Sequence, residues 1–182
     1  MHQAPTIWTI GHSTRPISEF TDLLLAHDIG LLVDVRTIPR SRHNPQFNAD
    51  TLAHSLREAG LQYRHLAELG GLRKPKKDSV NDGWRNASFR GYADYMQTME
   101  FLNALEELMV TGRLWPTAVM CAEAVPWRCH RSLIADALTC RGWNVRHITS
   151  SAQAASHALT SFAQYEKGRL TYPKATDTPS LF

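Results

Sequence analysis

Apolar runs of strand length alternate with amphipathic helical patterns along most of the chain. The runs lack the polar alternation of a half-exposed strand, which is typical of strands buried on both faces of a sheet. Most of them end at a glycine, a charged residue or a cysteine. Strands are therefore expected at residues 6–10, 31–35, 61–65, 116–121 and 144–148.

Helical spacing of apolar residues between these runs predicts the helices. Residues 66–89 show no periodicity and contain Gly70-Gly71, so this segment is expected to be a long loop. The expected helices are one that begins at Pro16, one over 49–59 capped by Asn48 and ended by Gly60, one over 92–110 ended by Gly112, one ending at Gly142, and a last one from Thr149 or Ser150 to about Tyr165.

Alternating strands and helices imply right-handed crossovers and a parallel sheet covered on both faces. The expected fold is a Rossmann-like α/β three-layer sandwich around a mostly parallel five-stranded sheet. A strand order of 3-2-1-4-5 would make the first and fourth strands neighbours and open a crevice at their carboxyl ends. Residues 1–168 are expected to form a single domain, and residues 169–182 an irregular tail.

Bulk properties narrow the function only slightly. The 182 residues carry a formal charge of +3, which favours anionic ligands weakly and falls short of a dedicated nucleic-acid binder. Three cysteines argue against a disulfide framework and for reduced thiols. The amino terminus does not resemble a signal peptide and no apolar run is long enough to span a membrane, so a cytoplasmic protein without a membrane partner is expected. We expect no cofactor and no metal, and the oligomeric state stays open.

Cys121 is the most reactive candidate because it ends an expected strand just before a helix. Free N–H groups and the partial positive charge of a helix start lower the pKa of a nearby thiol. Cys121 is therefore a candidate nucleophile. The alternative is that it is a small apolar residue finishing a buried strand.

Two known arrangements of such a cysteine fit less well. Phosphatases and sulfurtransferases of the rhodanese type place five residues between the cysteine and an arginine, whereas six separate Cys121 from Arg128, and Glu123 would repel a phosphate. A zinc site of Cys121, Cys129 and His130 lacks a Cys-x-x-Cys pair. Both stay as minor alternatives, and a buried structural role is favoured for His130.

Charged residues follow the strand ends. Glu123 is expected to pair with Arg36, either as a structural ion pair or in acid/base chemistry. The segment from Arg36 through Arg40 and Ser41 to Arg42 outlines an anion clamp, because guanidinium groups bind phosphate or carboxylate bidentately. Surface arginines that only solvate a loop are the alternative.

The long loop at 66–89 offers a second basic surface. Loops of this length are often lids or binding segments, and its cations are Arg73, Lys74, Lys76 and Lys77. The alternative is a solvated, mobile insertion whose charges only keep it soluble.

The ordered series of short motifs resembles domain-of-unknown-function family 488 from about Thr6 to Ile148. The motifs are Gly11-His12-Ser13, Asp34-Val35-Arg36 with Pro39-Arg40-Ser41-Arg42, Leu69-Gly70-Gly71, Tyr92 to Met96, Cys121-Ala122-Glu123 and Cys129-His130-Arg131. The resemblance implies a bacterial-type α/β domain with a motif-lined cleft and no established activity.

The cleft is expected to bind an anionic, phosphate-bearing small molecule or a nucleic-acid end. The alternative is a non-catalytic module that binds nucleic acid or protein through the 66–89 loop. Arg36, Arg42 and Arg131 are expected to hold the anion. The candidates for chemistry are Cys121, Glu123 and His12, and those for ligand binding are Gly11, Ser13, Asp34, Arg36, Arg40, Ser41, Arg42, Tyr63, Gly70, Gly71, Tyr92, Cys129, His130 and Arg131.

Overall fold

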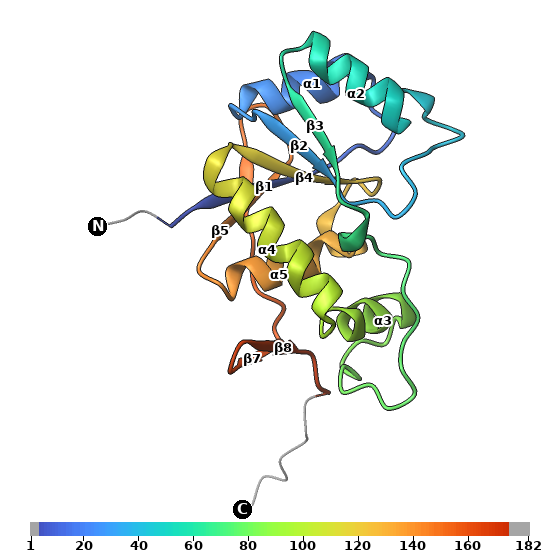
Figure 1. Cartoon of the computed structure of the whole chain (residues 1–182), viewed down its shortest axis with the longest axis vertical. Coiled ribbons are helices and arrows are strands. Elements are labelled where there is room, and N and C mark those ends of the chain that lie inside the picture. Colours follow the sequence, from blue (N-terminus) through green and yellow to red (C-terminus); the bar gives the residue numbers. More distant parts are fainter. Residues whose placement is uncertain (1–3, 175–182) are drawn as a thin grey trace, which may run out of the picture.

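The computed structural model describes residues 4–174, and its central sheet is built from the apolar runs of the sequence (Figure 1). Every residue of β2 and β4 is buried, which explains why these runs show no polar alternation. The expected strands are all present. Their bounds are β1 (Thr6–Gly11), β2 (Leu31–Asp34), β3 (Gln62–His65), β4 (Thr117–Cys121) and β5 (Asn144–Ile148).

The sheet has six strands where five were expected, because β6 (Ala154–Ser156) adds to its edge. The strand order is β3-β2-β4-β1-β5-β6, so the expected order 3-2-1-4-5 is wrong. Strand β4 lies between β1 and β2, and β1 pairs with β5 on its other side. The expected neighbourhood of the first and fourth strands is confirmed, with Gly11 opposite Cys121. The carboxyl ends of β1 and β4 therefore lie side by side.

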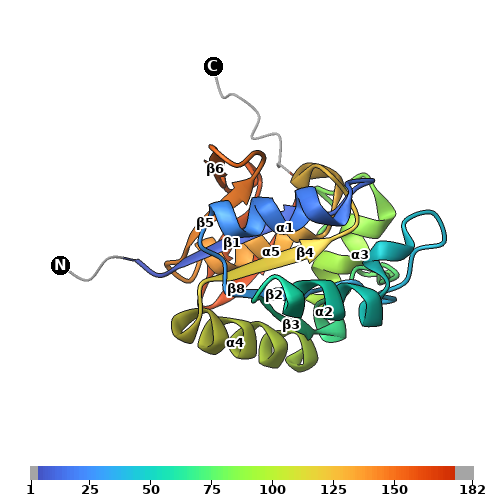
Figure 2. The same ribbon diagram turned by 90° about the horizontal axis from the view of Figure 1, so that it is seen from above.

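Helices cover both faces of the sheet and give the expected three-layer α/β sandwich (Figures 1 and 2). On one face, α1 (Ile17–Ala26) and α2 (Ala49–Glu58) contribute Phe20, Leu24, Leu52 and Leu56 to one core cluster. On the other face, α4 (Met99–Leu114) and α5 (Arg131–Thr139) contribute to a second cluster. Across residues 4–174, every helix falls short of the length and apolarity needed to cross a membrane.

The single helix expected over 92–110 is two helices, α3 (Ala87–Tyr95) and α4. Thr98 causes the break, because its hydroxyl accepts a hydrogen bond from the Phe101 amide, 3.3 Å away, and so caps α4. Gly112 does not end α4, which continues to Leu114. A glycine inside the helix lets its backbone pack closely on Ile7.

The helix expected from Thr149 or Ser150 to Tyr165 is wrong. Strand β6 (Ala154–Ser156) instead pairs antiparallel with β5, and β7 (Gln164–Glu166) pairs with β8 (Arg169–Thr171). Asp136 of α5 fixes this path by accepting hydrogen bonds from the Thr160 amide and the His157 ring. Residues 169–171, expected in the irregular tail, form β8, and residues 175–182 lie outside the described part of the chain.

Candidate functional site

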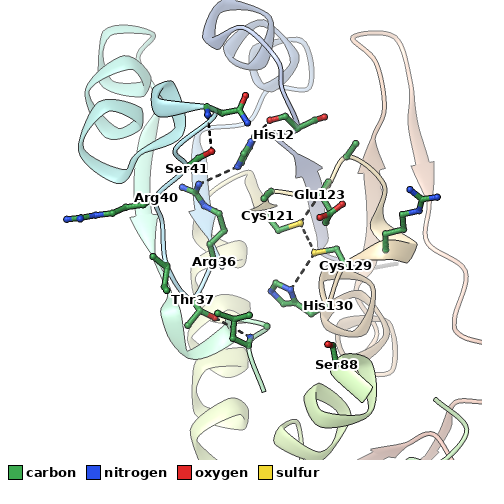
Figure 3. A pocket seen from close by; sticks show the side chains of 18 of the residues that line it. His12, Arg36, Thr37, Arg40, Ser41, Ser88, Cys121, Glu123, Cys129 and His130 are labelled. Atoms are coloured by element: carbon green, nitrogen blue, oxygen red, sulfur yellow. Dashed lines mark hydrogen bonds between the residues drawn. The ribbon is translucent and has the colours of Figure 1, made fainter. Parts of the chain in front are cut away.

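A cleft of about 720 Å³ opens at the carboxyl ends of β1, β2 and β4 (Figure 3). The loops that follow these strands form most of its wall. These loops lead to helices on opposite faces of the sheet, which opens the crevice between them. The residues singled out in the sequence that line it are His12, Ser13, Arg36, Arg40, Ser41, Gly71, Cys121, Glu123, Cys129 and His130.

The cleft also contains residues that the sequence did not single out as binding residues. Ser88 and Phe89 come from the first turn of α3, which the sequence had assigned to the end of a loop. The segment after β2 that contains Arg36 and Arg40 also supplies Thr37, Ile38 and Asn44. Including every residue of that segment would have found them from the sequence. The remaining additions are Thr14, Leu72, Ala122, Ala124 and Arg128.

Other expected site residues do not line the cleft, and some of them support its wall from behind. The residues absent from the cleft lining are Gly11, Asp34, Arg42, Tyr63, Gly70, Tyr92 and Arg131. Gly11 faces the Glu123 carbonyl and Gly70 faces Thr37, with no room for a side chain at either position. The buried Tyr92 donates its hydroxyl hydrogen bond to the Leu69 carbonyl, 2.8 Å away. The expected clamp of Arg36, Arg42 and Arg131 is therefore not assembled around one cavity.

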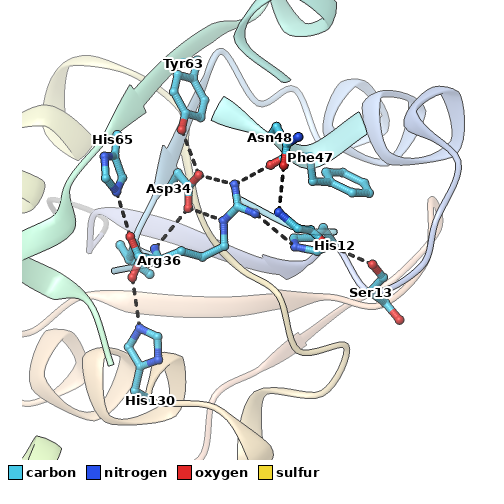
Figure 4. Close-up of polar contacts among 11 residues, drawn as sticks. His12, Ser13, Asp34, Arg36, Phe47, Asn48, Tyr63, His65 and His130 are labelled. Carbon is cyan, nitrogen blue, oxygen red and sulfur yellow. Dashed lines mark hydrogen bonds and ion pairs between the residues drawn. The ribbon is translucent and has the colours of Figure 1, made fainter. Parts of the chain in front are cut away.

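Arg36 pairs with Asp34, not with Glu123 (Figure 4). Its Nη2 lies 2.6 Å and its Nε 2.9 Å from the two carboxylate oxygens of Asp34, and Nη2 also donates to the Phe47 carbonyl. Tyr63 donates to the same carboxylate at 2.8 Å. The expected Arg36–Glu123 pair is wrong because a carboxylate two residues away already satisfies the guanidinium.

Glu123 is exposed and forms no salt bridge within residues 4–174. Its carboxylate is free to contact a ligand in the cleft. A carboxylate in water needs no buried partner, so the physical reason for expecting a pair with Arg36 does not apply.

His12 is a buried, neutral imidazole. Its Nδ1 lies 2.7 Å from the Ser13 carbonyl, so Nδ1 carries the proton, and its Nε2 lies 3.4 Å from Arg36 Nη1 and accepts from it. Burial, assisted by the Arg36 charge, lowers the pKa of His12. The ring also stacks on Phe47 with centroids 4.2 Å apart. His12 therefore acts mainly as a fixed part of the wall.

Ser13 adopts a left-handed backbone conformation with φ of 50°. A residue other than glycine is uncommon there, and such strain is concentrated at functional sites. The conformation turns the chain sharply after β1, so that Ser13 and Thr14 reach the cleft.

Cys121 and Cys129 contact each other on the floor of the cleft (Figure 3). Their Sγ atoms lie 2.6 Å apart, and Cys129 donates to Cys121. This hydrogen bond lowers the pKa of Cys121, burial opposes it, and the charge of Arg131 lowers it further. The same hydrogen bond and burial raise the pKa of Cys129. The pKa of Cys121 is therefore the lower of the two.

His130 lies beside the cysteines and connects them to β2. Its Nε2 donates to the Val35 carbonyl at 3.2 Å, which leaves Nδ1 as an acceptor 3.5 Å from Cys129 Sγ. Burial lowers the pKa of His130 to about 4, so the ring is neutral near pH 7. Gly71 packs directly on this ring, which explains why no side chain stands there.

Two carbonyl groups of the loop after β4 point toward Cys121 and Arg131, unlike the backbone of a phosphatase-type cradle. In such a cradle backbone N–H groups surround the anion, whereas here the Glu123 carbonyl faces Cys121 Sγ at 3.8 Å and the Ala124 carbonyl faces Arg131 Nη2 at 3.3 Å. Carbonyl oxygens repel an oxyanion. Among residues 4–174 no three or more His, Cys, Asp or Glu side chains form a group suited to a metal.

Comparison with known proteins gives one finding. A family model described as domain of unknown function DUF488 matches residues 16–138, which is more than half of the chain. The chain belongs to the DUF488 family. The DUF488 match contains Arg36, Cys121 and His130, but it begins after the Gly11-His12-Ser13 motif and ends before β5. No curated protein and no solved structure matches the chain.

Proposed function

We propose that the cleft of this DUF488 protein binds an anionic small molecule that carries a phosphate group. The proposal rests on Arg40 and Arg128, two exposed arginines that line the cleft from the loops after β2 and β4. Within residues 4–174 neither forms a salt bridge, whereas Arg36 is neutralised by Asp34. The planar fork of a free guanidinium suits a phosphate bidentately.

The rest of the lining suits a nucleotide better than a bare phosphate. A volume near 720 Å³ lies in the range of small-molecule sites and exceeds what one phosphate would fill. Ile38 and Leu72 are 62% and 74% exposed at the cleft, and such apolar side chains suit the flat face of a base. The free carboxylate of Glu123 suits a hydroxyl group of the ligand.

The first prediction is that Arg40→Ala combined with Arg128→Ala abolishes nucleotide binding. ADP is the probe, and thermal unfolding is the measurement. A ligand present at 100 times its Kd adds about 2.7 kcal/mol of stability, which raises the melting temperature of the wild-type protein. The double variant should lose this rise. Arg57→Ala, which removes an exposed arginine of α2 outside the cleft, should keep it.

The competing function uses the 66–89 loop, where Lys74, Lys76 and Lys77 are exposed. A variant in which all three lysines are replaced by glutamate distinguishes the two proposed functions. Its second probe is a 5′-phosphorylated single-stranded oligonucleotide, whose binding is measured by fluorescence anisotropy. If the oligonucleotide needs the lysines and ADP causes no melting shift in the wild type, the cleft proposal is overturned. The same holds if the Arg40 and Arg128 double variant keeps the full ADP shift.

A further inference from the structure

Two cysteines meet at the point where β4 turns toward α5. Cys121 is the last residue of β4, and Cys129 follows the short helix η3 (Pro126–Arg128), which folds the chain back on itself. Their sulfurs are 2.6 Å apart, so an approach of roughly half an ångström reaches the disulfide bond length of about 2.05 Å. Both residues line the cleft, although each side chain is buried.

Arg131 places an uncompensated charge beside this pair. The residue is 1% exposed, and its guanidinium stays protonated in proteins. Its Nη2 donates to the Ala124 carbonyl, while Nε and Nη1 have no hydrogen-bond partner among residues 4–174. A buried cation needs an anion nearby. Among residues 4–174 no carboxylate forms a salt bridge with Arg131. Its charge lowers the pKa of both cysteines, so the anion that it favours here is a thiolate of this pair.

The proton of Cys129 has two possible acceptors. One is the Cys121 sulfur, and the other is His130 Nδ1, whose lone pair is free because Nε2 donates to Val35. Cys129 can therefore give up its proton when Cys121 changes its chemical state. The second thiol of a redox pair must be able to do this before it can attack the first.

We propose that Cys121 and Cys129 form a redox-active dithiol site that reduces small hydroperoxides. The Cys121 thiolate attacks one oxygen of the hydroperoxide and breaks the O–O bond, which gives a sulfenic acid on Cys121 and releases hydroxide or alkoxide. The Cys129 sulfur then attacks the Cys121 sulfur. An S–S bond forms, and the sulfenic oxygen leaves as water with the proton of Cys129.

One external reductant is needed to complete the catalytic cycle. Two thiols are oxidised to one disulfide, and the hydroperoxide is reduced to water and an alcohol, or to two waters if it is hydrogen peroxide. A low-molecular-weight dithiol then reduces the disulfide by thiol–disulfide exchange. The substrate is small because the sulfurs lie buried on the floor of the cleft. This activity does not depend on the anion that the cleft is proposed to bind.

The first test is to map the oxidised sulfurs of the full chain after treatment with one equivalent of hydrogen peroxide. Peptide mass spectrometry should find a Cys121–Cys129 disulfide, with Cys140 reduced and reacting at least tenfold more slowly. Cys140→Ala should form the same disulfide at the wild-type rate, because Cys140 lies at the far end of α5. Reduced Cys121 and Cys129 after this treatment, or oxidation of Cys140 first, overturns the proposal.

The second test is turnover, measured as hydrogen peroxide consumed with dithiothreitol as the reductant. Wild type and Cys140→Ala should consume many equivalents of peroxide per protein, and Cys121→Ser should fall to the rate of dithiothreitol alone. Cys129→Ser should stop at a sulfenic acid on Cys121, which dimedone labels. A disulfide that forms without turnover overturns the peroxide-reducing activity. If a serine variant fails to fold, the wild-type and Cys140→Ala measurements still decide the outcome.

Discussion

The Asp34 carboxylate shows how a single residue determines the architecture of the cleft wall. It is fully buried and accepts hydrogen bonds from Arg36 and Tyr63, while its Oδ1 also accepts from the Arg36 amide at 3.1 Å. One carboxylate therefore accepts the hydrogen bonds of the Arg36 guanidinium, the Arg36 amide and the Tyr63 hydroxyl. The Arg36 guanidinium in turn donates to His12, so that Asp34, Arg36 and His12, at the carboxyl ends of β1 and β2, form one connected unit.

Asp34→Asn should destabilise the protein by about 3 to 5 kcal/mol, because it leaves the Arg36 charge buried without a counter-ion. Tyr63→Phe, which removes one hydrogen bond and keeps the ion pair, should cost only about 1 to 3 kcal/mol. Urea unfolding at neutral pH measures both. If both variants lose the same free energy of unfolding, the Asp34–Arg36 ion pair is not the main contribution of Asp34 to stability.

At the scale of elements, the 66–89 segment is an anchored loop. Asp94 of α3 accepts hydrogen bonds from the Lys76 amide at 2.8 Å, the Ser79 hydroxyl at 2.6 Å and the Asn81 amide nitrogen at 2.8 Å. Asn81 in turn accepts from the Tyr172 amide. These contacts hold the loop between α3 and the end of the described chain. The exposed Lys74, Lys76 and Lys77 therefore belong to an anchored segment.

Asp94→Ala should release this loop without unfolding the domain. Three donors lose their acceptor, so local opening becomes easier, and each 1.4 kcal/mol of easier opening raises the open population about tenfold. Limited trypsin digestion should then cut after Lys76 or Lys77 at least tenfold faster than in the wild type. Ser79→Ala, which removes one of the three contacts, should show a smaller increase. First cleavage at another site in Asp94→Ala would contradict the anchoring role.

At the scale of the whole molecule, the partly buried His130 and the buried His147 contact different strands of the sheet. His130 contacts β2, and His147 of β5 hydrogen-bonds to the Thr9 hydroxyl at 2.7 Å and to His157 at 2.9 Å. Burial lowers the pKa of each to about 4, and in His147 the neighbouring His157 adds to the effect. Both rings are therefore neutral in the folded protein at pH values where they are protonated in the unfolded chain.

Stability should consequently fall as the pH is lowered from about 7 toward 4. Between these values the unfolded chain, with a histidine pKa near 6.5, binds more protons than the folded protein, so the free energy of unfolding decreases as protons are added. Urea midpoints at pH 7.5, 6.5 and 5.5 measure this trend. His147→Gln should flatten the slope relative to the wild type. A midpoint that stays constant or rises on acidification would contradict the prediction.

The sequence by itself determined which segments form the parallel strands and which residues stand at their carboxyl ends. Both are local properties, because an apolar run buried on both faces and the polar residue that ends it are neighbours in the chain. The candidate cleft with Cys121, Ser13 and Arg40 followed from them. The family resemblance of the motifs agrees with the DUF488 match over residues 16–138.

Only the tertiary structure decided which of these elements and side chains lie together. The apolar sequence of a fully buried strand does not indicate which strands it pairs with. The position of β4 between β1 and β2 therefore depends on how the helices pack on the two faces of the sheet. The path after β5 likewise depends on a tertiary contact, in which Asp136 of α5 holds His157 just beyond β6. The contact of Cys121 with Cys129 is equally a product of the turn at η3, since spacing along a chain does not fix a distance in space.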